Sequence, residues 1–147
     1  MFLIEMKMRK LVVLLSVISA LNICGQSNKK IAADYIKKAN AAIENSIDYT
    51  TALINFNKAM KYMDAITDEK VASLGARAYF EIHHKQRTLK KQIQFLEKSN
   101  LYSQQYFSLA KNKNSNNYMN NLEIYSLSKT ALKKLRYKAR RLTMGKF

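Results

Sequence analysis

Apolar residues recur every three or four positions along most of the chain after residue 30. That spacing places them on one face of an α-helix, whereas a half-buried strand would show strict alternation of apolar and polar residues. Short polar stretches separate the periodic segments. The pattern predicts about six helices, near residues 30–45, 49–65, 68 onward, 87–99, 101–110 and 118–142. We therefore expect an all-α fold made of antiparallel helical hairpins.

The same spacing predicts which side chains the middle helices bury. The second helix would bury Ala52, Phe56, Ala59 and Met63, and the third would bury Val71, Leu74, Ala78 and Ile82. Asp48 and Thr67 stand before these helices, where a side-chain oxygen can accept a hydrogen bond from a free backbone N–H. Composition agrees with helices, because the 147 residues include no Pro and only three Gly.

Residues 1–25 have the pattern of a secretory signal, which precedes a single helical domain over residues 26–147. A basic segment, Lys7–Lys10, is followed by the apolar run Leu11–Ile23. That run is too short for a comfortable membrane span, which needs roughly 20 apolar residues. The chain turns sharply polar after it. We therefore expect an exported protein, periplasmic or secreted.

Two ways of processing this leader remain open. Cleavage after Gly25 would make Gln26 the new N-terminus, and this resembles the leaders of exported proteins of the Bacteroidetes. Lipidation at Cys24, the only cysteine, would anchor the chain to a membrane. A lipobox normally holds a small residue where Ile23 stands, so the sequence favours cleavage.

The intact mass of the protein recovered from cells distinguishes these routes. We expect a chain that begins at Gln26, because a small glycine precedes the predicted scissile bond. A diacylglyceryl mass on Cys24 would indicate lipidation instead. A full-length mass, from Met1 or from the alternative starts Met6 and Met8, would contradict both routes.

Small and aromatic residues follow a distinct order along the second predicted helix. Ala52 is followed by Phe56 and Ala59, and Leu74 and Gly75 stand side by side on the next helix. These residues resemble the tetratricopeptide repeat, which carries Leu-Gly on its first helix and A-x3-F with a further Ala on its second. Residues 36–64 form the first copy by this resemblance, and the second begins about 35 residues later.

The resemblance implies stacked helical hairpins that bind a protein or peptide partner on an inner surface built from first helices. By that resemblance, the candidate partner-binding residues are Tyr35, Lys38, Arg77 and Tyr79. Packing inside the fold is the alternative role for the tyrosines. An ordinary helical bundle without repeats predicts the same antiparallel hairpins, so the fold class does not depend on the repeat.

The last predicted helix concentrates the positive charge of a chain whose formal net charge is +16. No acidic residue follows Glu123, and Lys129 interrupts an otherwise apolar inner face. That inner face consists of Leu122, Tyr125, Leu132, Leu135, Ala139 and Leu142. The candidate anion-binding residues are Lys133, Lys134, Arg136, Lys138, Arg140 and Arg141. Such a basic amphipathic helix caps a helical stack, binds an anionic membrane surface or binds a polyanion, and export argues against nucleic acid as the partner.

No catalytic or metal-binding pattern stands out in the sequence. His83 and His84 point about 100° apart on a helix, and with Glu81 as the only nearby carboxylate they do not form a zinc site. No Ser-His-Asp arrangement, phosphate-binding loop or carboxylate pair is visible. We therefore expect a non-enzymatic, cofactor-free protein- or peptide-interaction module of the bacterial envelope. The alternative is a peripheral membrane or polyanion-binding protein that acts through its C-terminal helix.

Overall fold

The computed structural model describes residues 27–144, and this part of the chain is all-helical, without strands. Residues 27–46 are helical. The helices that follow are α2 (Tyr49–Met60), α3 (Glu69–Ile82), α4 (Leu89–Leu109) and α5 (Asn116–Met144), with a short 3-10 turn, η1 (His83–Lys85), after α3. The predicted all-α class is confirmed. The predicted leader, including Cys24, lies outside the described residues.

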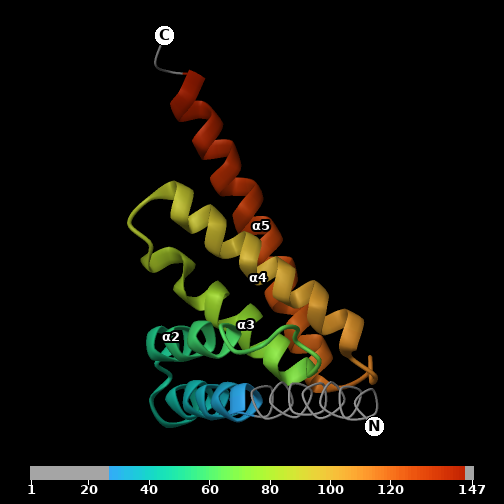
Figure 1. The fold of residues 1–147 in the computed structure, drawn as a ribbon. Coiled ribbons are helices and arrows are strands. Elements are labelled where there is room, and N and C mark those ends of the chain that lie inside the picture. The colour runs from blue at the N-terminus through green and yellow to red at the C-terminus, as the bar shows by residue number, and fades with distance from the viewer. Residues whose placement is uncertain (1–26, 145–147) are drawn as a thin grey trace, which may run out of the picture.

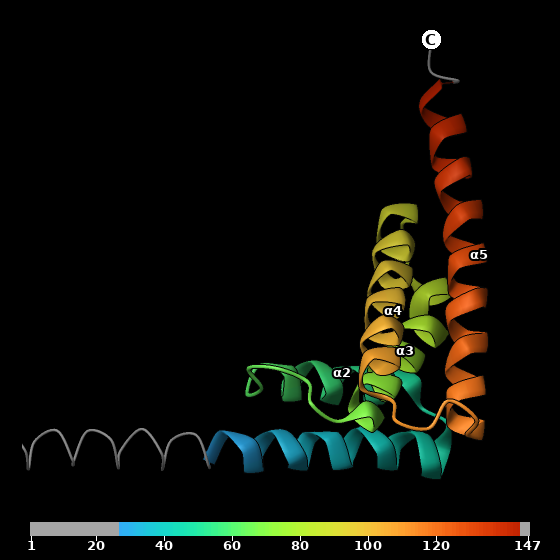
Figure 2. The ribbon, with the colours of Figure 1, turned by 90° about the vertical axis from the view of Figure 1, so that its right-hand side faces the viewer.

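The helices form two groups that meet at α3. The segment 27–46 and α2 lie side by side as an antiparallel pair, and α3, α4 and α5 run away from this pair (Figure 1). Helix α3 packs against α2, α4 and α5, so it is the central element. Figure 2 shows α4 and α5 standing together, with α5 continuing past the end of α4.

The first pair turns through a helix C-terminus of the αL type, with one further backbone bond from the next residue. The N–H of Ile47 donates to the carbonyl of Ile43 and the N–H of Asp48 to that of Ala42, both at 3.0 Å. Ile47 has a φ of 54°, in the left-handed region that favours glycine. Asp48 then caps α2 as predicted, accepting the N–H groups of Thr50 and Thr51. The Thr51 side chain and these N–H groups lower the pKa of Asp48.

Several predicted helix boundaries differ from the structure. Segments 87–99 and 101–110 are a single helix, α4, because Asn100 lies in a stretch without Gly or Pro and nothing there breaks the backbone ladder. The described chain therefore has five helices rather than six. Helix α2 ends at Met60 rather than near residue 65. The cap of α3 is Asp68 and not Thr67, since the Asp68 carboxylate accepts the N–H of Lys70 at 2.8 Å.

Aromatic rings from three helices form the centre of the core. Phe56 of α2 is fully buried and meets Tyr79 of α3 and Tyr102 of α4 edge-on, with ring centroids 6.4 and 5.1 Å apart. Tyr79 and Tyr102 are stacked at 5.7 Å, and burial raises the pKa of Tyr102. The rings thus join α2, α3 and α4.

Small residues surround the ring of Phe56, as predicted, and they allow α2 and α3 to approach closely. Ala52 and Ala59 are fully buried beside Phe56. A Cβ atom on Gly75 would stand only 2.5 Å from Cζ of Phe56. Gly75 therefore leaves the space that the tip of the ring occupies. The predicted stripe of α3 is also confirmed, since Val71, Leu74, Ala78 and Ile82 are all buried; Met63 lies beyond α2 and is half-buried.

Helix α5 buries two polar side chains, Asn121 and Ser128, besides Leu132 and the ring contacts that Tyr118 and Tyr125 make with α4. Nδ2 of Asn121 donates to Oγ of Ser73 at 2.9 Å, and Oγ of Ser128 donates to the carbonyl of Leu96 at 3.2 Å. On α4, Oγ of Ser99 donates to the carbonyl of Ala76 at 2.9 Å. Short side chains let the helix backbones approach closely, and these bonds use the hydroxyls of Ser99 and Ser128 and the amide N–H of Asn121. Oγ of Ser103 and Oδ1 of Asn121, in contrast, have no partner within residues 27–144.

The predicted inner face of α5 is therefore wrong in part. Leu132 is buried, and Tyr125, Leu135 and Ala139 are half-buried. Leu122 and Leu142 are 43 % and 57 % exposed. Asn121, a residue before Leu122 and about 100° away around the helix, takes the buried position instead.

We expect Gly75→Ala to destabilise the fold by about 1–3 kcal/mol, because the new methyl group overpacks the ring of Phe56. Urea unfolding measures the loss. The same substitution should cost less in a Phe56→Leu background, which shortens the opposing side chain. An equal loss of unfolding free energy in both backgrounds would show that Gly75 is not needed to make room for the ring of Phe56.

We expect Ile47→Gly to stabilise the fold by about 1 kcal/mol, since glycine adopts a positive φ without a steric penalty. The lost side chain is 72 % exposed, so little burial is given up. The matched control is Ile54→Gly, an exposed isoleucine inside α2, which should destabilise the fold because glycine weakens a helix interior. Thermal unfolding of the two variants tests the opposite signs.

Candidate functional site, a cationic groove

Four cationic side chains of α5 form one row along the helix. Lys129, Lys133, Arg136 and Arg140 follow one another at intervals of four, three and four residues. At about 100° per residue this spacing keeps them on a single face, and all four are exposed. We call these four residues the cation row.

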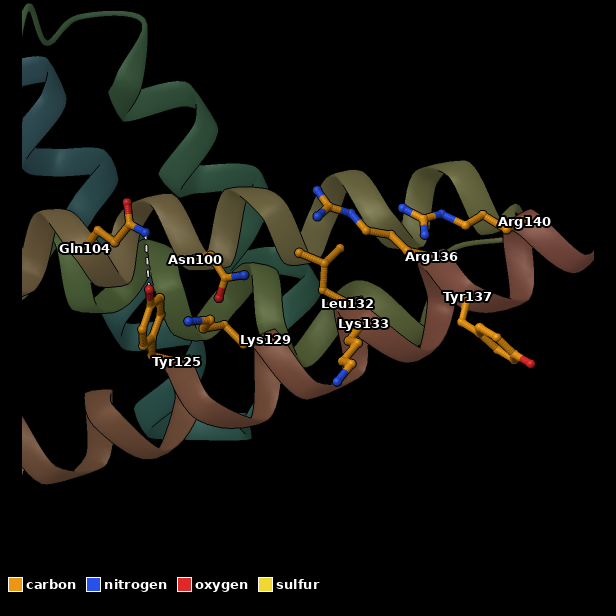
Figure 3. Close-up of a pocket in the computed structure, with 9 residues that line it drawn as sticks. All are labelled: Asn100, Gln104, Tyr125, Lys129, Leu132, Lys133, Arg136, Tyr137 and Arg140. Atoms are coloured by element: carbon orange, nitrogen blue, oxygen red, sulfur yellow. Dashed lines mark hydrogen bonds between the residues drawn. The ribbon is translucent and has the colours of Figure 1, made fainter.

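The cation row borders a groove between α4 and α5 with a volume of about 530 Å³. Figure 3 shows that α4 contributes Asn100 and Gln104, while the other lining residues come from α5. The α5 residues are Tyr125, Lys129, Leu132, Lys133, Arg136, Tyr137 and Arg140. Nε2 of Gln104 donates to the Tyr125 hydroxyl at 3.3 Å across the groove. The groove thus combines positive charge with amide groups and aromatic surface.

One carboxylate already contacts the cation row. Nη2 of Arg136 lies 2.7 Å from Oε1 of Glu97, the only acidic residue of α4. The two side chains are 54 % and 44 % exposed, so solvent screens the pair and it stabilises the fold only weakly. Positive charge therefore dominates the groove.

The six basic residues predicted to bind anions divide between two faces of α5. Lys133, Arg136 and Arg140 belong to the cation row, which Lys129 completes. Lys134, Lys138 and Arg141 lie on a second face, roughly 140° around the helix. All of them are exposed. The structure thus brings together three of the six predicted residues and adds Lys129, which interrupted the predicted apolar face.

The four candidate partner-binding residues do not form one surface. Tyr35 and Lys38 are neighbours, with Nζ of Lys38 5.4 Å from the ring centroid of Tyr35. The guanidinium of Arg77 lies elsewhere, 5.4 Å from the ring centroid of Tyr49. Tyr79 is buried in the core, and its hydroxyl donates to Oδ1 of Asn57 at 2.6 Å. Tyr79 therefore packs inside the fold, which was the alternative role considered for the tyrosines.

Other hollows and clusters carry a weaker chemical signal. A groove of about 1000 Å³ beside the helical segment 27–46 is lined by side chains of both charge signs, among them Lys37, Glu44 and Asp68. His83 and His84 lie in η1. Within residues 27–144, no group of three or more His, Cys, Asp and Glu side chains could hold a metal ion.

Sequence reasoning missed the α4 side of the cationic groove. Asn100 fell between the two predicted helices 87–99 and 101–110 and Gln104 fell in the second, so the prediction gave them no common face. The unbroken α4 places them one turn apart along the same side. A signal was present, since no Gly or Pro separates the two segments.

None of the helices within residues 27–144 is long and apolar enough to cross a bilayer. Comparisons with models of protein families, with curated proteins and with solved structures find no match to this chain. The geometry of the groove is therefore the basis for a functional proposal.

Proposed function

We propose that this chain is an exported, non-enzymatic binding module that holds an acidic segment of a protein partner along the cation row. The observation that carries the proposal is the groove itself. It is lined by four cations, and Glu97 is the only carboxylate of α4 that faces them. A leader of secretory pattern and tetratricopeptide-like residues support export and partner binding.

The cation row is unfavourable for the isolated fold. Like charges three or four residues apart on a helix destabilise it by about 0.2–0.5 kcal/mol per pair. The row contains three such successive pairs, and within residues 27–144 only Arg136 has a partner in an ion pair. An acidic partner would relieve this repulsion, so the charges favour association over isolation.

Apolar surface next to the cations gives the groove the composition of an interface. Leu132 forms part of its floor and the ring of Tyr125 points toward α4, while the ring of Tyr137 points away from α4 at the outer edge (Figure 3). Tyr and Arg are common among the residues that contribute most to binding energy. The ionisable groups here hold an anion by charge and hydrogen bonds, and they include no nucleophile paired with a base. The proposal is therefore one of binding.

The second face of α5 supports a different candidate function. Lys134, Lys138 and Arg141 share that face with Leu127, which is 48 % exposed. Cations around exposed apolar residues bind anionic lipid surfaces. A peripheral membrane protein is thus the second candidate, and it uses residues other than the cation row.

Two triple variants with equal net charge separate these candidates. Lys129→Gln/Lys133→Gln/Arg140→Gln removes most of the cation row, and Lys134→Gln/Lys138→Gln/Arg141→Gln removes the second face. The probe is a fluorescent poly-glutamate peptide, measured by anisotropy with the processed chain. We expect the first variant to bind about tenfold more weakly, as the loss of three partly exposed ion pairs implies, and the second to change by less.

Equal losses in both variants would mean that only net charge matters, and this would contradict a defined site. Flotation with phosphatidylglycerol vesicles tests the second candidate. Binding to vesicles that is lost only in the second variant, together with no binding of poly-glutamate, would replace the partner proposal with the membrane one.

A further inference from the structure

We infer that the acidic segment held by the groove is an α-helix, which docks as an additional rod against α4 and α5. This inference rests on the proposed function and names the conformation and charge spacing of the partner. The partner helix would carry carboxylates at positions i, i+4, i+7 and i+11, with apolar side chains between them. Four observations support it.

The first observation is the spacing of the cation row. Its members are separated by four, three and four residues, which corresponds to steps of about 4.5–6 Å along α5 at 1.5 Å per residue. Carboxylates on one face of a partner helix repeat about every 5.4 Å. Side chains on one face of an extended peptide repeat about every 6.4–6.8 Å, which is two residues. A helix therefore stays in register with all four cations, and an extended peptide drifts by about 3–4 Å over the row.

The second observation is that the α4–α5 pair already seats a helix on its other side. Ser99 of α4 and Asn121 of α5 both bond to α3, through Ala76 and Ser73. Asn100 is about 100° around α4 from Ser99, on the side away from α3. In Figure 3 the groove faces the viewer and α3 passes behind the pair. Two adjacent helices can contact a third helix on either side, and within residues 27–144 only one of the two sides is occupied, by α3.

The third observation is that the cation row already binds a helix-borne carboxylate. Glu97 lies on α4, which runs antiparallel beside α5, and its carboxylate reaches Arg136 at 2.7 Å. A side chain carried by a neighbouring helix can therefore meet the row with ion-pair geometry. A partner helix on the open side would present its carboxylates in the same way to Lys129, Lys133 and Arg140.

The fourth observation is the apolar component of the groove. Tyr125 is half-buried and Tyr137 is 64 % exposed at the rim, so the two rings supply the apolar surface, whereas Leu132 is already buried. A peptide with carboxylates alone would leave this surface uncovered. An acidic amphipathic helix covers it with its apolar side chains, as in other helix-in-groove complexes.

The test compares three peptides of about 20 residues, long enough for measurable helicity, with the processed chain. The first carries Glu at i, i+4, i+7 and i+11 with Leu between them. The second has the same composition with the Glu residues distributed around the helix. The third is the first peptide with a central Pro, which breaks the helix. Fluorescence anisotropy measures binding, and circular dichroism follows peptide helicity.

We expect the first peptide to bind at least about tenfold more tightly than the other two, which is the effect of roughly 1.4 kcal/mol of lost register. Its helicity should rise on binding. The Lys129→Gln/Lys133→Gln/Arg140→Gln variant should remove this preference, and the second-face variant should keep it. Glu97→Gln should strengthen binding of the first peptide, because it frees Arg136.

The outcomes separate this inference from the proposed function. Equal binding of the three peptides that still depends on the cation row would overturn the helical partner and leave an acidic partner in place. Binding that ignores the row would overturn both. Tighter binding of poly-phosphate than of the first peptide, with the same dependence on the row, would also overturn the helical partner and identify a different class of anion.

Discussion

The position of α3 depends on one close contact, between the ring of Phe56 and the bare Cα of Gly75. A Cβ atom on any larger residue at position 75 would lie 2.5 Å from Cζ of this ring, which is too close for a non-bonded contact. The ring also meets Tyr79 and Tyr102, which brings α3 and α4 to the same point. Because interiors are close-packed, a ring held from three sides leaves little freedom to the helices that carry it. The α4–α5 pair is built on the α3 that this contact positions.

The rotation of α5 about its own axis then determines what the molecule offers to a partner. Asn121 and Ser128 face inward and make hydrogen bonds to α3 and α4. This polar packing turns the cation row, Tyr125 and Tyr137 toward the groove and leaves the second basic face on the far side. Leu122 lies seven residues before Lys129 and on the same face as the row, so a rotation of about 100° that buried Leu122 would also turn the row into the helix interface. The small polar side chains of α5 therefore fix the geometry of the proposed site.

Much of the fold follows from local pattern. The buried stripes of α2 and α3, the Asp48 cap and the small residues beside Phe56 were predictable because apolar residues there return once per turn. The unbroken α4 was misread as two helices, since its apolar residues change face along its length. The site was predicted in part, as a concentration of positive charge on the last helix. The division of the basic residues of α5 into two faces follows from the helical period alone. The period does not tell which of the two faces lies beside α4.

By itself, the sequence determined that the chain is helical, which faces of α2 and α3 are buried, and that the last helix carries a run of basic residues with no acid after Glu123. These properties depend on residues within a few turns of each other, and they can be read along the chain. The tertiary structure alone decided that Asn121 and Ser128 are buried while Leu122 is exposed, and that Asn100 and Gln104 face the cation row. The physical reason is that a polar side chain becomes a packing residue only when a partner group stands opposite it, and those partners lie 21 to 48 residues away in the chain.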